Sequence, residues 1–299
     1  LALHNRPIVK PSTPHPNPSP QTHPDASEPI APQTATQASH PATTRFTTPD
    51  ERQLRMLLWL VAVGFFMQTL DATIVNTALP AMAQSLNTSP LHMQTVLVAY
   101  SLTMAMLIPI SGWMADRFGT RRVYMGAILV FVLGSLLCGL AATVPQLVVA
   151  RIVQGAGGAL LLPVGRLAVL RGYPRERFLA AMSFVAIPGL IGPLLGPALG
   201  GWLVQFASWH WVFFINVPVG LVGWLVAQKF LPDFRGSNVQ RLDAAGYALL
   251  ALGMMFVSLS VDGFAGFGWS LGMIAAVMLT GIGCLAAYWQ RAAQQEHPL

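Results

Sequence analysis

The sequence predicts an all-α membrane protein that crosses the bilayer about eight times. Hydrophobic residues make up 54% of the chain and charged residues only 9%. The mean hydropathy is +0.56. The apolar residues also come in blocks of about 20, the length that a helix needs to cross the hydrocarbon core. These three observations favour membrane helices over a soluble fold.

Each apolar block predicts one span, and the blocks are separated by short polar or basic connections. In chain order the spans are Met56–Leu79, Leu91–Gly112, Val123–Ala142, Pro145–Leu170, Ala180–Val204, Trp211–Leu231, Ala244–Val261 and Trp269–Trp289.

The first six spans form two similar triplets. Spans one and four each carry one membrane charge, Asp71 and Arg151. Spans two and five both end in Gly-Trp, and these ends face opposite sides of the membrane. Inverted repeats of this kind are typical of transporters. We therefore divide the chain into a tail (1–52), a six-span unit (53–231) and a segment with two further spans (232–299).

The tail differs in composition from the rest of the chain. Eleven of its first fifty residues are proline, and it shows no hydrophobic periodicity. This composition predicts a disordered, partly polyproline segment.

The basic residues lie before the first span and in alternate connections, while the loops near 80–91, 142–145, 205–210 and 262–268 contain no Lys or Arg. This positive-inside pattern places both termini in the cytoplasm. It also explains the net charge of +6 without a nucleic-acid partner. Arg151 and Arg166 fall within spans, whereas Lys229 lies at the very end of the sixth span.

The fifth span contains a run of glycine and proline that would disrupt a soluble helix. A membrane helix tolerates both residues. At 100° per residue, Gly192, Gly196 and Gly200 form one smooth ridge, with Pro193, Pro197 and Gly201 beside it. Small residues let helices approach closely, so the ridge predicts a tightly packed helix partner.

Asp71 is the clearest candidate for a functional residue, because a carboxylate in a span is costly. It lies about 12 Å from the outer end of its helix, and Arg151 lies about 10 Å from the same side. Because the depths match, an ion pair between Asp71 and Arg151 is possible. If the pair broke in a drier site, Asp71 would take a proton. The alternatives are a permanent structural ion pair or a water-exposed aspartate.

The connection after span two has the sequence GWMADRFGTRR. We expect its two glycines to bracket a tight turn and Asp116 to cap the following helix or pair with an arginine. The motif residues are Gly112, Asp116, Arg117, Gly119, Arg121 and Arg122.

Together these features resemble the major facilitator superfamily, specifically its fourteen-span drug:proton antiporters of the EmrB/QacA type. Four motifs carry the resemblance: LDATIVNTALP from Leu70, the Gly112–Arg122 loop, RIVQGAGGA from Arg151, and the Gly/Pro run, which is followed by WHWVFFINVPVG from Trp209. The resemblance covers about Trp59 to Trp289.

The resemblance implies roles for the matching residues. Asp71, Arg151, Gln154 and Gly155 would serve proton coupling, and the loop residues would serve gating. The Gly/Pro residues would close a leak between halves, so the surface that meets the ridge would belong to a second six-span half that this chain lacks. The fold implied is the N-terminal six-helix bundle plus two linker spans.

The activity implied is efflux of hydrophobic or cationic drugs in exchange for H⁺ across a bacterial inner membrane. No cofactor, metal or enzymatic activity is expected; the sequence has no H-E-x-x-H metalloprotease motif, and the spans contain no cluster of carboxylates. One departure is His210, which replaces the arginine usual between the two tryptophans; we expect it to be a solvated loop residue. Met114, where leucine is usual, should matter little.

Two alternatives remain open. The chain could be a fragment that does not transport. It could also be an assembly or regulatory subunit that pairs with another membrane protein through the glycine ridge.

Overall fold

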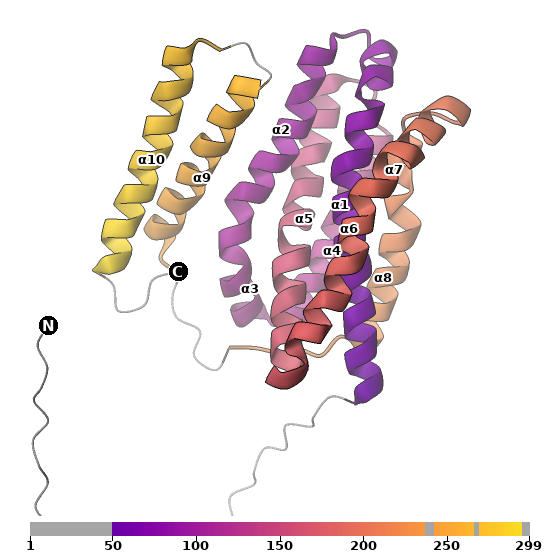
Figure 1. Ribbon diagram of the computed structural model, residues 1–299, viewed down its shortest axis with the longest axis vertical. Helices are drawn as coiled ribbons and strands as arrows, with labels where there is room; N and C mark the ends of the chain where they lie inside the picture. The colour runs from indigo at the N-terminus through magenta and orange to yellow at the C-terminus, as the bar shows by residue number, and fades with distance from the viewer. Residues whose placement is uncertain (1–49, 237–241, 266–268, 295–299) are drawn as a thin grey trace, which may run out of the picture. The chain divides into compact units, whose positions relative to one another are not determined.

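The computed structural model describes residues 50–236, 242–265 and 269–294, and all regular structure in these ranges is helical (Figure 1). Eight of the helical segments are long and apolar enough to cross a membrane. The predicted fold class and the eight spans are therefore confirmed. The predicted tail lies outside the described residues, apart from the few that precede and begin the first helix.

The helices differ from the predicted spans mainly at their ends. In chain order they are α1 (Glu51–Ser85), α2 (Pro90–Leu107), η1 (Ile108–Ile110), α3 (Ser111–Phe118), α4 (Thr120–Gly139), α5 (Val144–Gly172), α6 (Arg175–Phe206), α7 (Trp211–Phe214), α8 (Asn216–Phe230), α9 (Ala244–Ala265) and α10 (Leu271–Ala293). The second span combines α2, η1 and α3, and the sixth combines α7 and α8.

Local chemistry fixes several of these ends. Ser89, Thr143 and Ser270 each accept a hydrogen bond from a backbone N–H three residues later, at the starts of α2, α5 and α10. Such side chains satisfy donors that the first helical turn leaves free. Between α3 and α4 the chain reverses at Gly119, whose φ of 92° favours glycine.

The packing of the first six spans has an internal symmetry. Helix α1 packs on α6 and α5 packs on α2; α4 packs on α5 and α8 on α1; α4 also packs on α8. Exchanging α1 with α5, α2 with α6 and α4 with α8 returns the same set of pairs. Two spans lie between the members of each exchanged pair, so the two members run in opposite directions. This is the packing that an inverted repeat of three spans produces.

Two apolar clusters fill the bundle, one toward each end. On α1 the first cluster ends at Met67 and the second begins at Ile74. On α4 the gap between the clusters lies between Val132 and Cys138, and on α5 between Ala150 and Leu161. All three gaps fall at the same level of the bundle, and buried polar residues occupy them.

Helices α9 and α10 form a hairpin that packs on α2 through α9. The Tyr247 hydroxyl donates to the Met106 carbonyl at 3.0 Å. Within the hairpin, Arg291 donates two hydrogen bonds of 2.9 Å to the Asp243 carboxylate. The hairpin is thus tied to the outside of the six-span bundle at α2.

Candidate functional site

A buried network of charged and polar side chains occupies the layer between the two apolar clusters. Arg151 Nη1 of α5 donates to Asp71 Oδ2 of α1 at 2.6 Å, and also to Gln154 Oε1 at 2.6 Å. Gln154 Nε2 donates to Asp71 Oδ1 at 2.8 Å. Asp71 and Arg151 are 0% and 1% exposed. The ion pair that the matching depths made possible is present.

Two further helices complete the network. Asn216, the first residue of α8, donates from Nδ2 to Asp71 Oδ1 at 3.0 Å. Ser135 of α4 accepts from Gln154 Nε2 at 2.8 Å. Asp71 therefore accepts hydrogen bonds from three different side chains.

Aromatic rings cover the guanidinium of Arg151. Its Cζ lies 4.0 Å from the ring centroid of Tyr100 of α2 and 5.9 Å from that of Phe213 of α7. Within the described part of the chain, neither Arg151 Nε nor the Tyr100 hydroxyl has a hydrogen-bond partner. Both groups lie next to the ion pair, and each can donate a hydrogen bond to a bound group.

Glycines bring these helices close enough for the network to form. A Cβ at Gly134 of α4 would collide with the backbone of Gln154, and one at Gly157 of α5 would collide with the backbone of Phe131. At Gly155 a Cβ would lie 3.0 Å from the Tyr100 carbonyl of α2. Gly155 makes no polar contact with Asp71 here; instead it allows α2 to bring Tyr100 over Arg151.

A cavity of about 780 Å³ reaches this network from the side of α2 and α9. Arg151 and Tyr100 line it together with Asn76 of α1, Gln94 of α2 and Asp262 of α9. Asp262 Oδ2 is buried and has no hydrogen-bond partner among the described residues. The volume falls in the range of pockets that hold drug-sized ligands.

The Gly112–Arg122 loop has a different structure from the one expected. Gly112 lies inside α3 with open space beside it, so only Gly119 makes a turn. Asp116 does not cap α4, whose start has no side-chain cap. It forms an ion pair with Arg171 of α5, the second of the two predicted alternatives.

The Gly119 turn is held by the segment that follows α8. Thr120 N donates to the Phe234 carbonyl at 2.9 Å, and Phe234 N donates to Thr120 Oγ1 at 3.0 Å. Arg121 donates to the Gln228 carbonyl near the end of α8. Arg117 and Arg122, by contrast, are exposed. The six predicted gating residues therefore divide into a docked group and an exposed group.

The glycine ridge of α6 is packed tightly, but against α1 of the same chain. Gly192, Gly196 and Gly200 are buried, and a Cβ on them would collide with or crowd Thr69, Thr73 and Ile74. Pro193 and Pro197 on the neighbouring face are exposed, and a Cβ at the partly exposed Gly201 would meet nothing within 4 Å.

Two expectations about the ridge were therefore wrong. The surface that meets it does not belong to a second half, and the ridge is not free to bind another membrane protein. The reason is that threonines, which are small, recur on α1 at the spacing of a helix face. These small side chains let α1 pack closely against the ridge.

His210 is less solvated than we expected. Its ring stacks on Trp209 with 3.7 Å between centroids, and Nδ1 lies 3.1 Å from Ser208 Oγ. Partial burial lowers the pKa of His210 from its ordinary value, which favours the neutral ring.

Several residues of the site escaped the sequence-based prediction. Ser135, Tyr100 and Asn216 are uncharged and common in membrane helices, so nothing marks them individually. Asp262 was missed because we placed the end of the seventh span at Val261, and α9 continues to Ala265. Asn216 stood in one of the resembling motifs, but no role was attached to it.

Comparison with known proteins identifies the family. The profile of the Major Facilitator Superfamily matches residues 61–287. The chain belongs to the major facilitator superfamily. Solved transporter structures share the fold: for a peptide transporter POT in complex with sulfate, the TM-score is 0.59 at 21% identity, and the match covers 82% of this chain and 53% of that one. For the human organic anion transporter MFSD10 the TM-score is 0.56 at 14% identity, and the match covers 68% of this chain and 55% of that transporter.

Several relatives that match in sequence carry the name "Putative multidrug resistance protein MdtD". The protein from Serratia proteamaculans is 54% identical over 235 residues, which is 79% of this chain and 49% of the relative. The one from Pectobacterium atrosepticum is 51% identical over 246 residues, covering 82% and 53%. The chain thus spans about half the length of these relatives.

Proposed function

We propose that this chain supplies the N-terminal half and two linker spans of a proton-coupled multidrug exporter in a bacterial inner membrane. The buried network around Asp71 carries the proposal. The name of the relatives supports the substrate class, hydrophobic or cationic drugs. The proposal also includes cytoplasmic termini and a second six-span half as the partner needed for transport.

In the proposed mechanism Asp71 is the proton carrier. With Arg151, Gln154 and Asn216 donating to it, the carboxylate stays ionised. A movement of α1 relative to α5 and α8 would remove these donors together, since they come from different helices. Deprived of them in a low-dielectric site, Asp71 would take up a proton. Arg151 and Gln154 thus set when Asp71 binds H⁺, and Gly155 positions the ring that covers Arg151.

The substrate would occupy the cavity that Arg151 lines. Asp262 gives this cavity a carboxylate that suits a cationic drug, and apolar residues of α1 and α2 supply most of the remaining wall. Because Arg151 belongs to both the cavity and the network, a bound cation would disturb the Asp71 ion pair. That shared residue would couple the drug to the proton.

The other motifs have proposed roles in the conformational change. Asp116 and Arg117, with Gly112, Gly119, Arg121 and Arg122, would gate the cytoplasmic side. The Gly/Pro face of α6 would keep the path from leaking. In such a role α1 and α6 would move as one rigid unit, because Gly192, Gly196 and Gly200 of α6 pack on α1.

The test is transport in proteoliposomes. A chimera that joins this chain to the remaining half of the Serratia relative should show drug-dependent H⁺ movement. The variant Asp71→Asn of the chimera should lose this movement, whereas Glu51→Gln, at an exposed carboxylate, should keep it. Retention of H⁺ coupling by D71N would rule out the proposed role of Asp71.

The same assay separates the alternatives for the chain itself. We expect the 299-residue chain alone to give no drug-dependent H⁺ movement above empty liposomes. A clear signal from it would contradict the need for a second half.

A further inference from the structure

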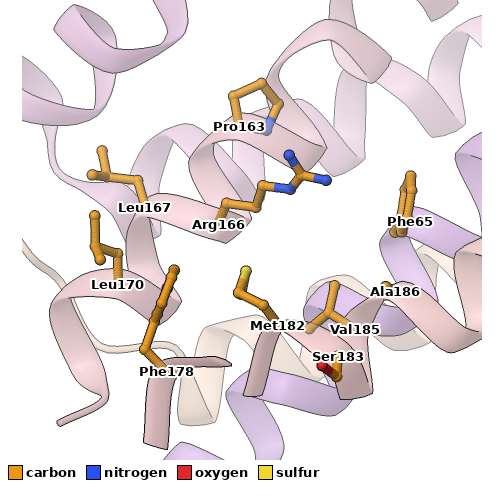
Figure 2. Close-up of a pocket in the computed structure, with 10 residues that line it drawn as sticks. All are labelled: Phe65, Pro163, Arg166, Leu167, Leu170, Phe178, Met182, Ser183, Val185 and Ala186. Carbon is orange, nitrogen blue, oxygen red and sulfur yellow. The ribbon is translucent and has the colours of Figure 1, made fainter. Parts of the chain in front are cut away.

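A second cavity lies between α1, α5 and α6, away from the Asp71 network. Its volume is about 660 Å³. Figure 2 shows its lining, which includes Phe65 of α1, Arg166 and Leu170 of α5, and Phe178 and Met182 of α6. All but two of its lining residues are apolar: one is Ser183 and the other is Arg166. Among the residues that the structure describes, no acidic side chain lines it.

Arg166 is unusual for its position. It lies six residues before Gly172, the end of α5, and so about 9 Å along the helix from that end. An arginine within a span is costly, and such residues usually have a partner. Among the described residues Arg166 takes part in no ion pair, whereas Arg171 on the same helix pairs with Asp116.

Arg166 is exposed, but its side chain does not extend toward the end of the helix. Long basic side chains usually extend toward the membrane surface. In Figure 2 the guanidinium of Arg166 instead points into the cavity, toward the side where Pro163 and Phe65 lie, and away from Leu170 and Phe178.

We propose that this cavity binds an amphipathic anion. The apolar part of the ligand packs on Phe65, Phe178 and Met182, and its carboxylate, sulfonate or phosphate group pairs with Arg166. A guanidinium offers two parallel N–H donors to such a group, and the apolar surroundings strengthen the pair. The absence of any acidic residue in the lining excludes the cationic ligands that suit the Asp262 cavity.

This inference goes beyond the proposed function, because it names a second ligand class at a separate site. Its test is equilibrium binding, which requires neither transport nor H⁺ coupling. The binding site and the proposed efflux activity can therefore fail independently.

The experiment uses the purified 299-residue chain in a neutral detergent and two ligands of the same shape, biphenyl-4-carboxylate and biphenyl-4-carboxamide. Isothermal titration should give a dissociation constant about tenfold lower for the carboxylate. Arg166→Gln should abolish this preference while it keeps binding of the amide. Arg166→Lys should retain part of the preference.

Two control variants locate the effect. Arg175→Gln removes the same charge from an exposed position near the start of α6 and should leave both affinities unchanged. Ala186→Trp fills the cavity and should weaken both ligands. A carboxylate preference that survives in R166Q, an equal loss of both ligands in R166Q, or unchanged binding in A186W would overturn the proposal.

A parallel measurement identifies the source of the anion. Native mass spectrometry with added phosphatidylglycerol or phosphatidylcholine tests a lipid in the cavity. Selective retention of phosphatidylglycerol that R166Q and A186W both lose would support an anionic lipid; binding of the free carboxylate would support a soluble ligand. If wild-type protein binds neither anion, the proposal is wrong.

Discussion

At the scale of single residues, the central feature is a buried ion pair whose carboxylate accepts three hydrogen bonds. Asp71 uses both oxygens, and Gln154 connects them to Ser135 through its amide. The pair itself could be predicted from the sequence, because charges in spans are rare and a helix has a fixed rise per residue. The uncharged members could not, since Asn, Ser and Tyr carry no comparable insertion cost.

Removing one member of the pair should destabilise the chain more than removing both. Asp71→Asn leaves Arg151 charged and buried, which should cost about 3–5 kcal/mol. The double variant D71N/R151Q should recover most of this loss. Thermal unfolding in detergent micelles, arranged as a double-mutant cycle, measures the coupling. Additive effects would show that the two side chains do not interact in solution.

His210 gives a prediction for pH dependence. Its lowered pKa means that the folded state prefers the neutral ring, while the unfolded chain titrates near 6.5. Its contribution to stability is therefore complete above pH 6.5 and is lost as the pH falls below that value. Compared with His210→Gln, the wild-type protein should lose unfolding temperature between pH 7 and pH 5. Parallel pH curves for the two proteins would contradict this.

At the scale of elements, the main feature is the contact between α1 and α6. Helix α6 has three internal prolines, and it stays well packed because its glycine ridge fits against α1. The ridge itself was predictable from the spacing of its glycines. Its partner was not, because that depends on which helix lies opposite, and the threonines at 69 and 73 give no signal until α1 is placed. Family resemblance pointed to the wrong partner.

A matched pair of glycine variants tests this contact. Gly196→Ala adds a Cβ that would collide with Thr73, so it should destabilise the protein by about 1–3 kcal/mol. Gly201→Ala, on the same helix, adds a Cβ in open space. It should leave stability unchanged or raise it by up to about 1 kcal/mol through helix propensity. Equal effects at both positions would show that α1 does not constrain the ridge.

At the scale of the whole molecule, the bundle consists of two apolar clusters separated by one polar layer. The number of spans and their grouping in threes followed from hydropathy and paired features such as Asp71 and Arg151. Which helices pack together did not, since apolar faces in a membrane carry little pattern. Among the described residues, the hydrogen bonds of the polar layer come from α1, α4, α5 and α8 and none comes from the hairpin of α9 and α10.

The six-span bundle should therefore remain folded without the hairpin. A chain ending at Gly236 keeps every helix that contributes to the Asp71 network and the segment that docks on the Gly119 turn. It should elute as a single species in size-exclusion chromatography and retain a cooperative thermal transition. Aggregation of this variant, with the 299-residue chain stable under the same conditions, would place the hairpin within the folding unit.

The ion pair also has a consequence for synthesis. Asp71 precedes Arg151 by 80 residues and Asn216 by 145. At 5–20 residues per second, the ribosome needs about 4 to 16 s to make the stretch between Asp71 and Arg151. Throughout that interval the first span exists without its counter-ion. During this time the Asp71 carboxylate must therefore be either protonated or still outside the bilayer. The first span reaches its final position in the membrane only when the fourth span arrives.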